Sequence, residues 1–200
     1  MNNQKSIEIH PDWYRDNPEM RFLILGSFPP HPTKRLYSFF YPNARNRFWP
    51  VLADLAGVKL QWTKTDKLKA VEERFEIMMK LKAGVQNLGY EIEREGMSAL
   101  DTRISIKKFH DILSIINTHP ELERILLPGY SAISSTARSF IRYLNENKIA
   151  VSTDVVFKPG SNFNFQMGER RINCVILNST STACRVGYSS LLEQFRRSLQ

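Results

Sequence analysis

The residues best suited to chemistry lie in one stretch, where aromatic rings alternate with arginines and asparagines. Residues 39–49 read FFYPNARNRFW. Aromatic rings can stack on a flat ligand, amides can hydrogen-bond to its edge, and guanidinium groups can bind phosphate oxygens. This combination is typical of a site that binds a nucleobase next to phosphate.

A predicted strand and a stiff loop precede this stretch. The unbroken apolar run of residues 22–25 predicts a strand that is covered on both faces in a parallel sheet, and Gly26 ends it. The next residues, 27–32, include three prolines, so the chain cannot return to a helix at once. Because open α/β sheets bind ligands at the carboxyl ends of their strands, we expect the functional site here. The alternative is an ordinary proline-rich connection.

Three blocks of the sequence resemble the uracil-DNA glycosylase superfamily, and they are nearest to its hypoxanthine-DNA glycosylase branch. The first block combines residues 26–29 (GSFP) with residues 41–49 (YPNARNRFW), the second is 94–101 (REGMSALD), and the third is 177–183 (LNSTSTA). They occur in the family's order and span most of the chain. The resemblance implies a single domain over residues 1–200 that removes a base from DNA.

The resemblance also assigns roles within the first block. Asn46 would be catalytic, since its amide can orient a water and donate a hydrogen bond to negative charge on the leaving base. Tyr41 would stack on the base, while Gly26, Ser27 and Phe28 would line the base pocket and supply backbone N–H donors. Many superfamily members carry a water-activating Asp or Asn at the position of Phe28, so this chain lacks that side chain.

Structural interpretations stand beside these roles. Asn46 could cap the helix that follows it, and Tyr41 could be an ordinary core or surface tyrosine. His31 in the site loop could be a general acid or base, or a solvated loop histidine. Asp101 in the middle block could orient a site residue or cap a turn.

The late block predicts a phosphate site. Small hydroxyl residues with exposed N–H groups can approach phosphate closely, which suggests that Ser179, Thr180 and Ser181 bind the DNA backbone. Arg185 and Arg45 would add positive charge there. A Ser/Thr-rich capping turn is the alternative.

Three positions depart from the family pattern. Gly89, Pro128 and Thr182 stand where relatives carry an acidic residue, a polar residue and a proline. The first two departures remove side chains that could act in the site. The third affects the geometry that keeps a base flipped out of DNA.

Hydrophobic spacing predicts the elements that position these blocks. We expect helices at 46–56, 68–82, 106–117, 132–145 and 188–199, and strands at 21–25, 84–90, 124–127, 153–157 and 172–177. Residues 1–20 should form an irregular arm, and 91–105 a flap at the mouth of the site. Strands separated by helices imply an α/β fold, a three-layer α/β/α sandwich with a central, mostly parallel four-stranded sheet.

Composition limits the class of protein. The chain carries 28 Lys and Arg against 20 Asp and Glu, a net charge of +8, which favours a polyanionic partner such as DNA. No apolar run approaches the ~20 residues that cross a bilayer, and we expect a soluble, cytoplasmic protein without a membrane partner. Cys174 and Cys184 have no companions at metal-ligand spacing, so neither a metal nor a cofactor is expected.

The leading hypothesis is a monomeric, monofunctional DNA glycosylase of base-excision repair. It would hydrolyse the N-glycosidic bond of a deaminated base, hypoxanthine or uracil, that is flipped out of DNA. No lysine occupies a motif position, so no Schiff-base lyase step is expected. One alternative is a catalytically silent family member that binds DNA or a nucleotide. A small-molecule nucleotide hydrolase is a third hypothesis, which the basic charge disfavours.

Overall fold

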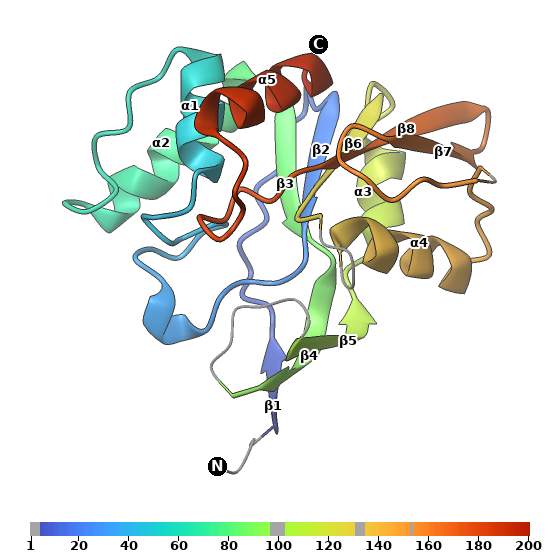
Figure 1. The fold of residues 1–200 in the computed structure, drawn as a ribbon, viewed down its shortest axis with the longest axis horizontal. Helices are drawn as coiled ribbons and strands as arrows, with labels where there is room; N and C mark the ends of the chain where they lie inside the picture. Colours follow the sequence, from blue (N-terminus) through green and yellow to red (C-terminus); the bar gives the residue numbers. More distant parts are fainter. Residues whose placement is uncertain (1–4, 97–102, 131–134, 153) are drawn as a thin grey trace.

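A five-stranded sheet forms the centre of the protein. The computed structural model describes residues 5–96, 103–130, 135–152 and 154–200. The strand order is β3-β2-β6-β8-β7 (Figure 1). The four parallel strands are β3 (Ala83–Asn87), β2 (Phe22–Gly26), β6 (Arg124–Pro128) and β8 (Arg170–Leu177). At the edge, β7 (Asn162–Met167) pairs antiparallel with β8. The expectation of a four-stranded sheet is therefore wrong, because β7 adds a fifth strand.

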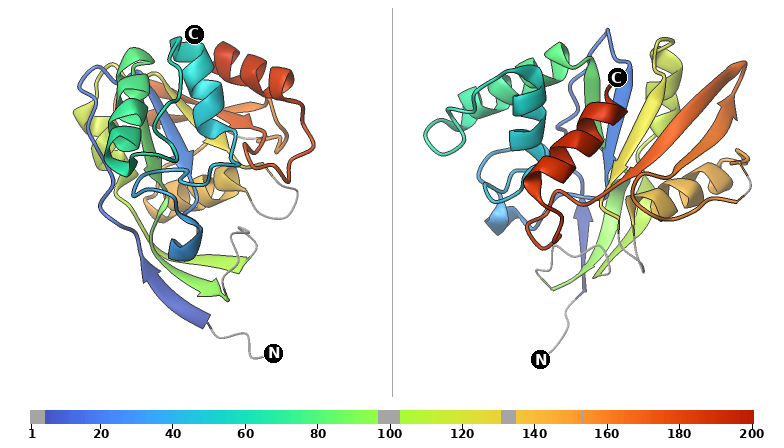
Figure 2. Two further views of the ribbon diagram at one scale, coloured as in Figure 1. Left: turned by 90° about the vertical axis from the view of Figure 1, so that its left-hand side faces the viewer. Right: turned by 45° about the horizontal axis from the view of Figure 1, so that its top comes forward.

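Helices cover both faces of this sheet (Figures 1 and 2). One face carries α1 (Phe48–Ala56), α2 (Lys67–Lys80) and α5 (Tyr188–Ser198), and the other carries α3 (Ile112–Thr118) and α4 (Thr136–Glu146). Successive residues of β2 alternate between the two cores, since Ile24 packs in the first and Leu25 in the second. The three layers agree with the expected architecture. None of the helices in the described part of the chain is long and apolar enough to cross a membrane.

A second, antiparallel sheet corrects three expectations. It has the order β1-β4-β5, with β1 (Lys5–Ile9), β4 (Gly89–Glu95) and β5 (Ile104–Phe109). In Figure 1 it lies below the arrowheads of the central strands. The expectation is therefore wrong at residues 5–9 of the irregular arm, at 91–95 and 104–105 of the flap, and at 106–109 of the helix expected at 106–117, all of which are in strands. Residues 10–20 of the arm are irregular, as expected. Asp101 and its neighbours at 97–100 in the middle block lie outside the described residues.

The remaining differences concern element bounds. The strand expected at 84–90 is interrupted at Leu88, where β3 ends and β4 begins after one residue. Helix α4 begins at Thr136, after Ser135, whose side chain accepts the N–H of Arg138. Residues 154–157 are not in a strand, although Val151 forms an isolated bridge with Phe165.

A buried ion pair joins the second sheet to the loop after β2. The Arg94 side chain is fully buried, and its Nε and Nη2 donate to the two carboxylate oxygens of Glu8 at 2.6 and 3.1 Å. Nη2 also donates to the carbonyl oxygen of Pro29 at 2.8 Å. The guanidinium carbon lies 5.7 Å from the centre of the Phe28 ring. The N-terminal strand therefore supports the loop in which the sequence places the site.

Replacing Glu8 by alanine should destabilise the protein, because it removes a carboxylate that accepts two hydrogen bonds from the buried Arg94 guanidinium. Loss of one partner from a buried pair costs about 3–5 kcal/mol in the free energy of unfolding. The matched control is Lys5→Ala on the same strand, since Lys5 pairs with Glu93 on the exposed face. The loss of stability in Lys5→Ala should be much smaller than in Glu8→Ala, because solvent screens an exposed ion pair. Equal losses in urea unfolding would show that the Arg94 pair has no special role.

Candidate functional site

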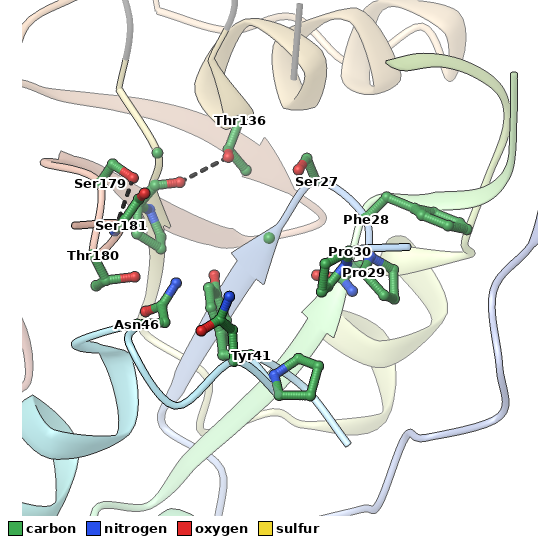
Figure 3. Close-up of a pocket in the computed structure, with 16 residues that line it drawn as sticks. Ser27, Phe28, Pro29, Pro30, Tyr41, Asn46, Thr136, Ser179, Thr180 and Ser181 are labelled. Atoms are coloured by element: carbon green, nitrogen blue, oxygen red, sulfur yellow. Dashed lines mark hydrogen bonds between the residues drawn. The ribbon is translucent and has the colours of Figure 1, made fainter. Parts of the chain in front are cut away.

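A pocket of about 210 Å³ opens at the carboxyl ends of β2, β3 and β6 (Figure 3). Its walls come from residues 26–30, 41–43 and 179–181, and from Asn46, Asn87, Pro128, Gly129 and Thr136. Sites for drug-sized ligands typically occupy ~300–1,000 Å³, so this pocket suits a smaller molecule such as a single ring system.

The structure brings two distant blocks of the sequence to this pocket. Eight of the expected site residues line it, namely Gly26, Ser27, Phe28, Tyr41, Asn46, Ser179, Thr180 and Ser181. Arg45 and Arg185 are exposed on the same two segments and do not belong to the lining. His31 is also outside the lining, and its Nδ1 accepts the N–H of Thr33 at the start of the 3-10 helix η1 (Pro32–Lys34). A capping role therefore accounts for His31.

Arg47 joins the two blocks. Its Nη1 donates to the carbonyl oxygen of Val186 at 2.5 Å, and Nη2 donates to those of Ser181 and Cys184 at 2.9 and 3.0 Å. Its backbone N–H donates to the carbonyl oxygen of Thr180 at 3.0 Å. One guanidinium thus fixes the backbone of the late loop against the start of α1. From the sequence, Arg47 was only one of the arginines in a stretch suited to phosphate binding, because no local signal shows that carbonyl groups surround it.

Asn46 accepts a hydrogen bond from the first residue of α1 and presents a donor at the same time, while the N-cap position belongs to Arg47. Its Oδ1 accepts the N–H of Phe48 at 2.9 Å, which holds the start of α1, although the helix itself begins at Phe48. This bond fixes the orientation of the amide, so Nδ2 with its two hydrogens is directed away from the helix (Figure 3). Asn46 is therefore not the N-cap of α1, and its hydrogen bond to Phe48 is compatible with a donor role for Nδ2.

Tyr41 lies against the pocket with one ring face covered. It stacks on Phe48 with ring centres 3.7 Å apart, and its backbone has a φ of +48°. A Cβ at Gly26 would lie 3.1 Å from the Tyr41 hydroxyl and 2.3 Å from Oδ1 of Asn87. Only glycine at position 26 leaves room for both polar groups.

Asn87 is a lining residue that sequence reasoning missed. It ends β3 and is 5% exposed. Its Nδ2 lies 2.9 Å from Nε2 of His10, and its Oδ1 is the atom nearest to Gly26. The signal that could have identified it is the Gln86-Asn87 pair, two amides at the carboxyl end of a strand in the parallel sheet.

The turn at residues 179–184 is held by its own hydroxyl groups. Ser179 Oγ accepts the N–H of Ser181 at 3.2 Å, and Ser181 Oγ accepts the N–H of Ala183 at 3.3 Å. Next to this turn, the Thr136 hydroxyl donates to the carbonyl oxygen of Pro128 at 2.7 Å (Figure 3). Both serine hydroxyls act as acceptors in these bonds, so each keeps its proton for donation to a ligand.

Two histidines lie behind the pocket wall. The ring of His10 is 5.5 Å from that of Phe28 and 4.8 Å from that of His110. Burial, together with the nearby His110 and Arg35, lowers the pKa of His10 from 6.5 to about 4, against the opposing effect of the Pro11 carbonyl. Burial also lowers the pKa of His110. Among the described residues, no three His, Cys, Asp or Glu side chains gather as a metal site would require.

Comparisons with known proteins support the fold. No protein-family model matches the sequence, and no curated protein matches it at a significant level. A solution NMR structure of a putative uracil DNA glycosylase from Methanosarcina acetivorans is similar to this chain, with a TM-score of 0.61 and 19% sequence identity. The similarity covers 97% of this chain and 99% of that chain. At this identity the similarity establishes a shared fold.

Replacing Arg47 by lysine should destabilise the protein, because an ammonium group cannot reproduce the planar fork that serves several carbonyl oxygens. Each hydrogen bond to a charged group is worth about 1.5–3 kcal/mol, and we expect a loss of about 2–3 kcal/mol in urea unfolding. Arg45→Lys, at an exposed position on the same segment, should change stability by less than about 0.5 kcal/mol. An Arg47→Lys variant as stable as the wild type would show that the Arg47 guanidinium does not hold the late loop against the start of α1.

Stability should also depend on the protonation of His10. The unfolded chain binds this proton near pH 6.5, whereas the folded protein resists it down to about pH 4. The contribution of His10 to the free energy of unfolding is therefore complete above pH 6.5. It is lost as the pH falls towards 4, by up to about 3 kcal/mol. Urea unfolding at pH 7 and pH 4.5 should show a smaller acid loss in His10→Gln than in the wild type. The same loss in both proteins would refute the assignment.

Proposed function

We propose that this protein is a DNA glycosylase that hydrolyses the N-glycosidic bond of a deaminated base, hypoxanthine or uracil, flipped out of DNA into the pocket. The observation that carries the proposal is the meeting of the Asn46 amide and the hydroxyls of residues 179–181 around one cavity of single-base size. The fold similarity to a protein described as a uracil DNA glycosylase supports it. The net charge of +8 suits a DNA partner.

The pocket offers hydrogen-bonding groups that suit a lactam edge. Uracil and hypoxanthine both carry a ring N–H next to a carbonyl group, whereas cytosine and adenine present a ring acceptor next to an amino group. Asn87 Oδ1 would accept the ring N–H, and the backbone N–H groups of Ser27 and Phe28 would donate to the carbonyl oxygen. A site that hydrogen-bonds a substrate rejects analogues that leave its polar groups unpaired. The same arrangement would therefore accept either deaminated base and reject both parent bases.

Catalysis would rest on charge stabilisation. As the bond from C1′ to the base breaks, its electron pair moves onto the base, and the Asn46 Nδ2 group donates to the developing negative charge. Water then attacks C1′, and its proton passes to solvent. Tyr41 would hold the flipped base by stacking, which is worth about 1–3 kcal/mol. The hydroxyls of residues 179–181 would hold the phosphate backbone, with Arg45 and Arg185 at the rim.

A catalytically silent relative is the second candidate. It is favoured by one observation, namely that none of the described residues lining the pocket carries a carboxylate or an imidazole to activate water. Such a protein would bind DNA with a lesion and form no product.

The test uses duplexes that carry hypoxanthine, uracil or xanthine at one position, with undamaged duplexes as controls. The wild type should produce alkali-labile abasic sites in at least one of the first two. Asn46→Asp should lower the rate about 100-fold, because it removes the donor. Its carboxylate still accepts the Phe48 N–H, so the melting temperature should stay close to that of the wild type.

The outcomes separate the two candidates. Binding without product for every lesion would favour the silent relative and overturn the glycosylase proposal. Undiminished cleavage by Asn46→Asp would remove Asn46 from the chemistry. Asn46→Ala, which loses both the acceptor for the Phe48 N–H and the donor, should be as inactive as Asn46→Asp and less stable.

A further inference from the structure

His10, in the N-terminal part of the chain, contacts the pocket-lining residue Asn87 from behind the pocket wall. It follows β1, is 5% exposed and does not line the pocket. Its two ring nitrogens have different partners: Nδ1 lies 2.5 Å from the carbonyl oxygen of Pro11, and Nε2 lies 2.9 Å from Nδ2 of Asn87.

These two contacts determine where the proton of His10 lies. A carbonyl oxygen can only accept, so Nδ1 must carry the hydrogen. In the neutral ring Nε2 is then an acceptor, and the group that faces it must be the NH₂ of Asn87 and not its oxygen. The amide oxygen is thereby turned to the other side, towards Gly26 and the pocket.

The surroundings of His10 keep the ring neutral. Trp13, Phe28 and Phe40 pack around it at ring-centre distances of 5.5–5.9 Å and exclude water. The positive charge of Arg35 opposes a second proton on His10, and so does His110 when it is protonated. An imidazolium would carry hydrogens on both nitrogens and would attract the oxygen of Asn87 instead of its nitrogen.

We propose that His10 is a positioning residue that sets the hydrogen-bonding polarity of Asn87 towards the base. By accepting a hydrogen bond from the amide nitrogen, it presents the carbonyl oxygen to the ring N–H of a lactam base. With the amide reversed, the pocket would instead offer a donor, which matches the ring acceptor of cytosine or adenine. Discrimination against cytosine and adenine then depends on a side chain that does not touch the base. This inference rests on the proposed glycosylase function.

The protonation of His10 can be measured without any activity. Long-range ¹H–¹⁵N correlation spectra of ¹⁵N-histidine-labelled wild-type protein at pH 7 should show His10 with the hydrogen on Nδ1 and an unprotonated Nε2. An Nε2–H tautomer or an imidazolium at pH 7 would overturn the proposal. The result holds even if the protein cleaves no lesion, so a failure of this inference is distinguishable from a failure of the proposed function.

The functional test is a double-mutant cycle on the cleaved lesion. His10→Leu should lower kcat/KM about 10-fold, roughly the value of one hydrogen bond, and have little further effect in an Asn87→Ala background. His10→Gln, whose side-chain oxygen can accept the Asn87 N–H, should retain most of the activity. Additive losses in the cycle would overturn the proposal, because they would show that His10 does not act through Asn87.

A matched control tests whether the loss of any buried histidine is enough to lower kcat/KM. His119 is 4% exposed, pairs with Asp16 and lies outside the pocket lining. His119→Leu should lower the melting temperature and leave kcat/KM unchanged. An equal loss of kcat/KM in His119→Leu and His10→Leu would mean that general destabilisation causes both, and it would overturn the specific role of His10.

Discussion

The site depends on the guanidinium of Arg47. It gathers the carbonyl oxygens of Ser181, Cys184 and Val186 around one planar group, which would otherwise need water or other donors. With these carbonyls turned inwards, the serine hydroxyls of the late loop lie on the pocket side, where Ser179 and Ser181 line the cavity. The same residue precedes α1, whose first turn carries Phe48 beneath Tyr41. One side chain therefore sets the distance between the two halves of the pocket.

The orientation of two amides gives the pocket its chemistry. An asparagine side chain is a donor at one end and an acceptor at the other, so its function depends on which end a neighbour occupies. At Asn46 the backbone N–H of Phe48 takes the oxygen, which leaves the nitrogen to donate. At Asn87 the imidazole of His10 takes the nitrogen, which leaves the oxygen to accept. The proposed function assigns opposite tasks to these two ends, charge stabilisation to the first and base recognition to the second.

The sequence predicted the parts of this arrangement that follow from general rules of α/β sheets. The strand ending at Gly26 and the strand ending at Leu177 run parallel in one sheet, so the loops after them had to meet at one edge. The second sheet was missed because a charged stretch is typical of a loop. In β4, however, Ile92 and Arg94 are buried and the residues on either side of Arg94 are less buried, which is the alternation of a strand. Strand β7 was missed for a similar reason. Its asparagines are typical of a loop, although they alternate with the buried Phe163 and Phe165. The structural roles of Arg47 and His10 could not be predicted from the sequence, because their partners lie far away along the chain.

The most direct measurement is a crystal structure of the protein with a duplex that contains a non-hydrolysable analogue of deoxyinosine or deoxyuridine. The account predicts a flipped base on the Tyr41 ring, with its ring N–H bonded to Oδ1 of Asn87 and a phosphate at residues 179–181. The Asn46 Nδ2 group should lie within hydrogen-bond reach of a heteroatom of the base. A base that stays stacked in the duplex, or DNA bound on another face with this pocket empty, would contradict the account.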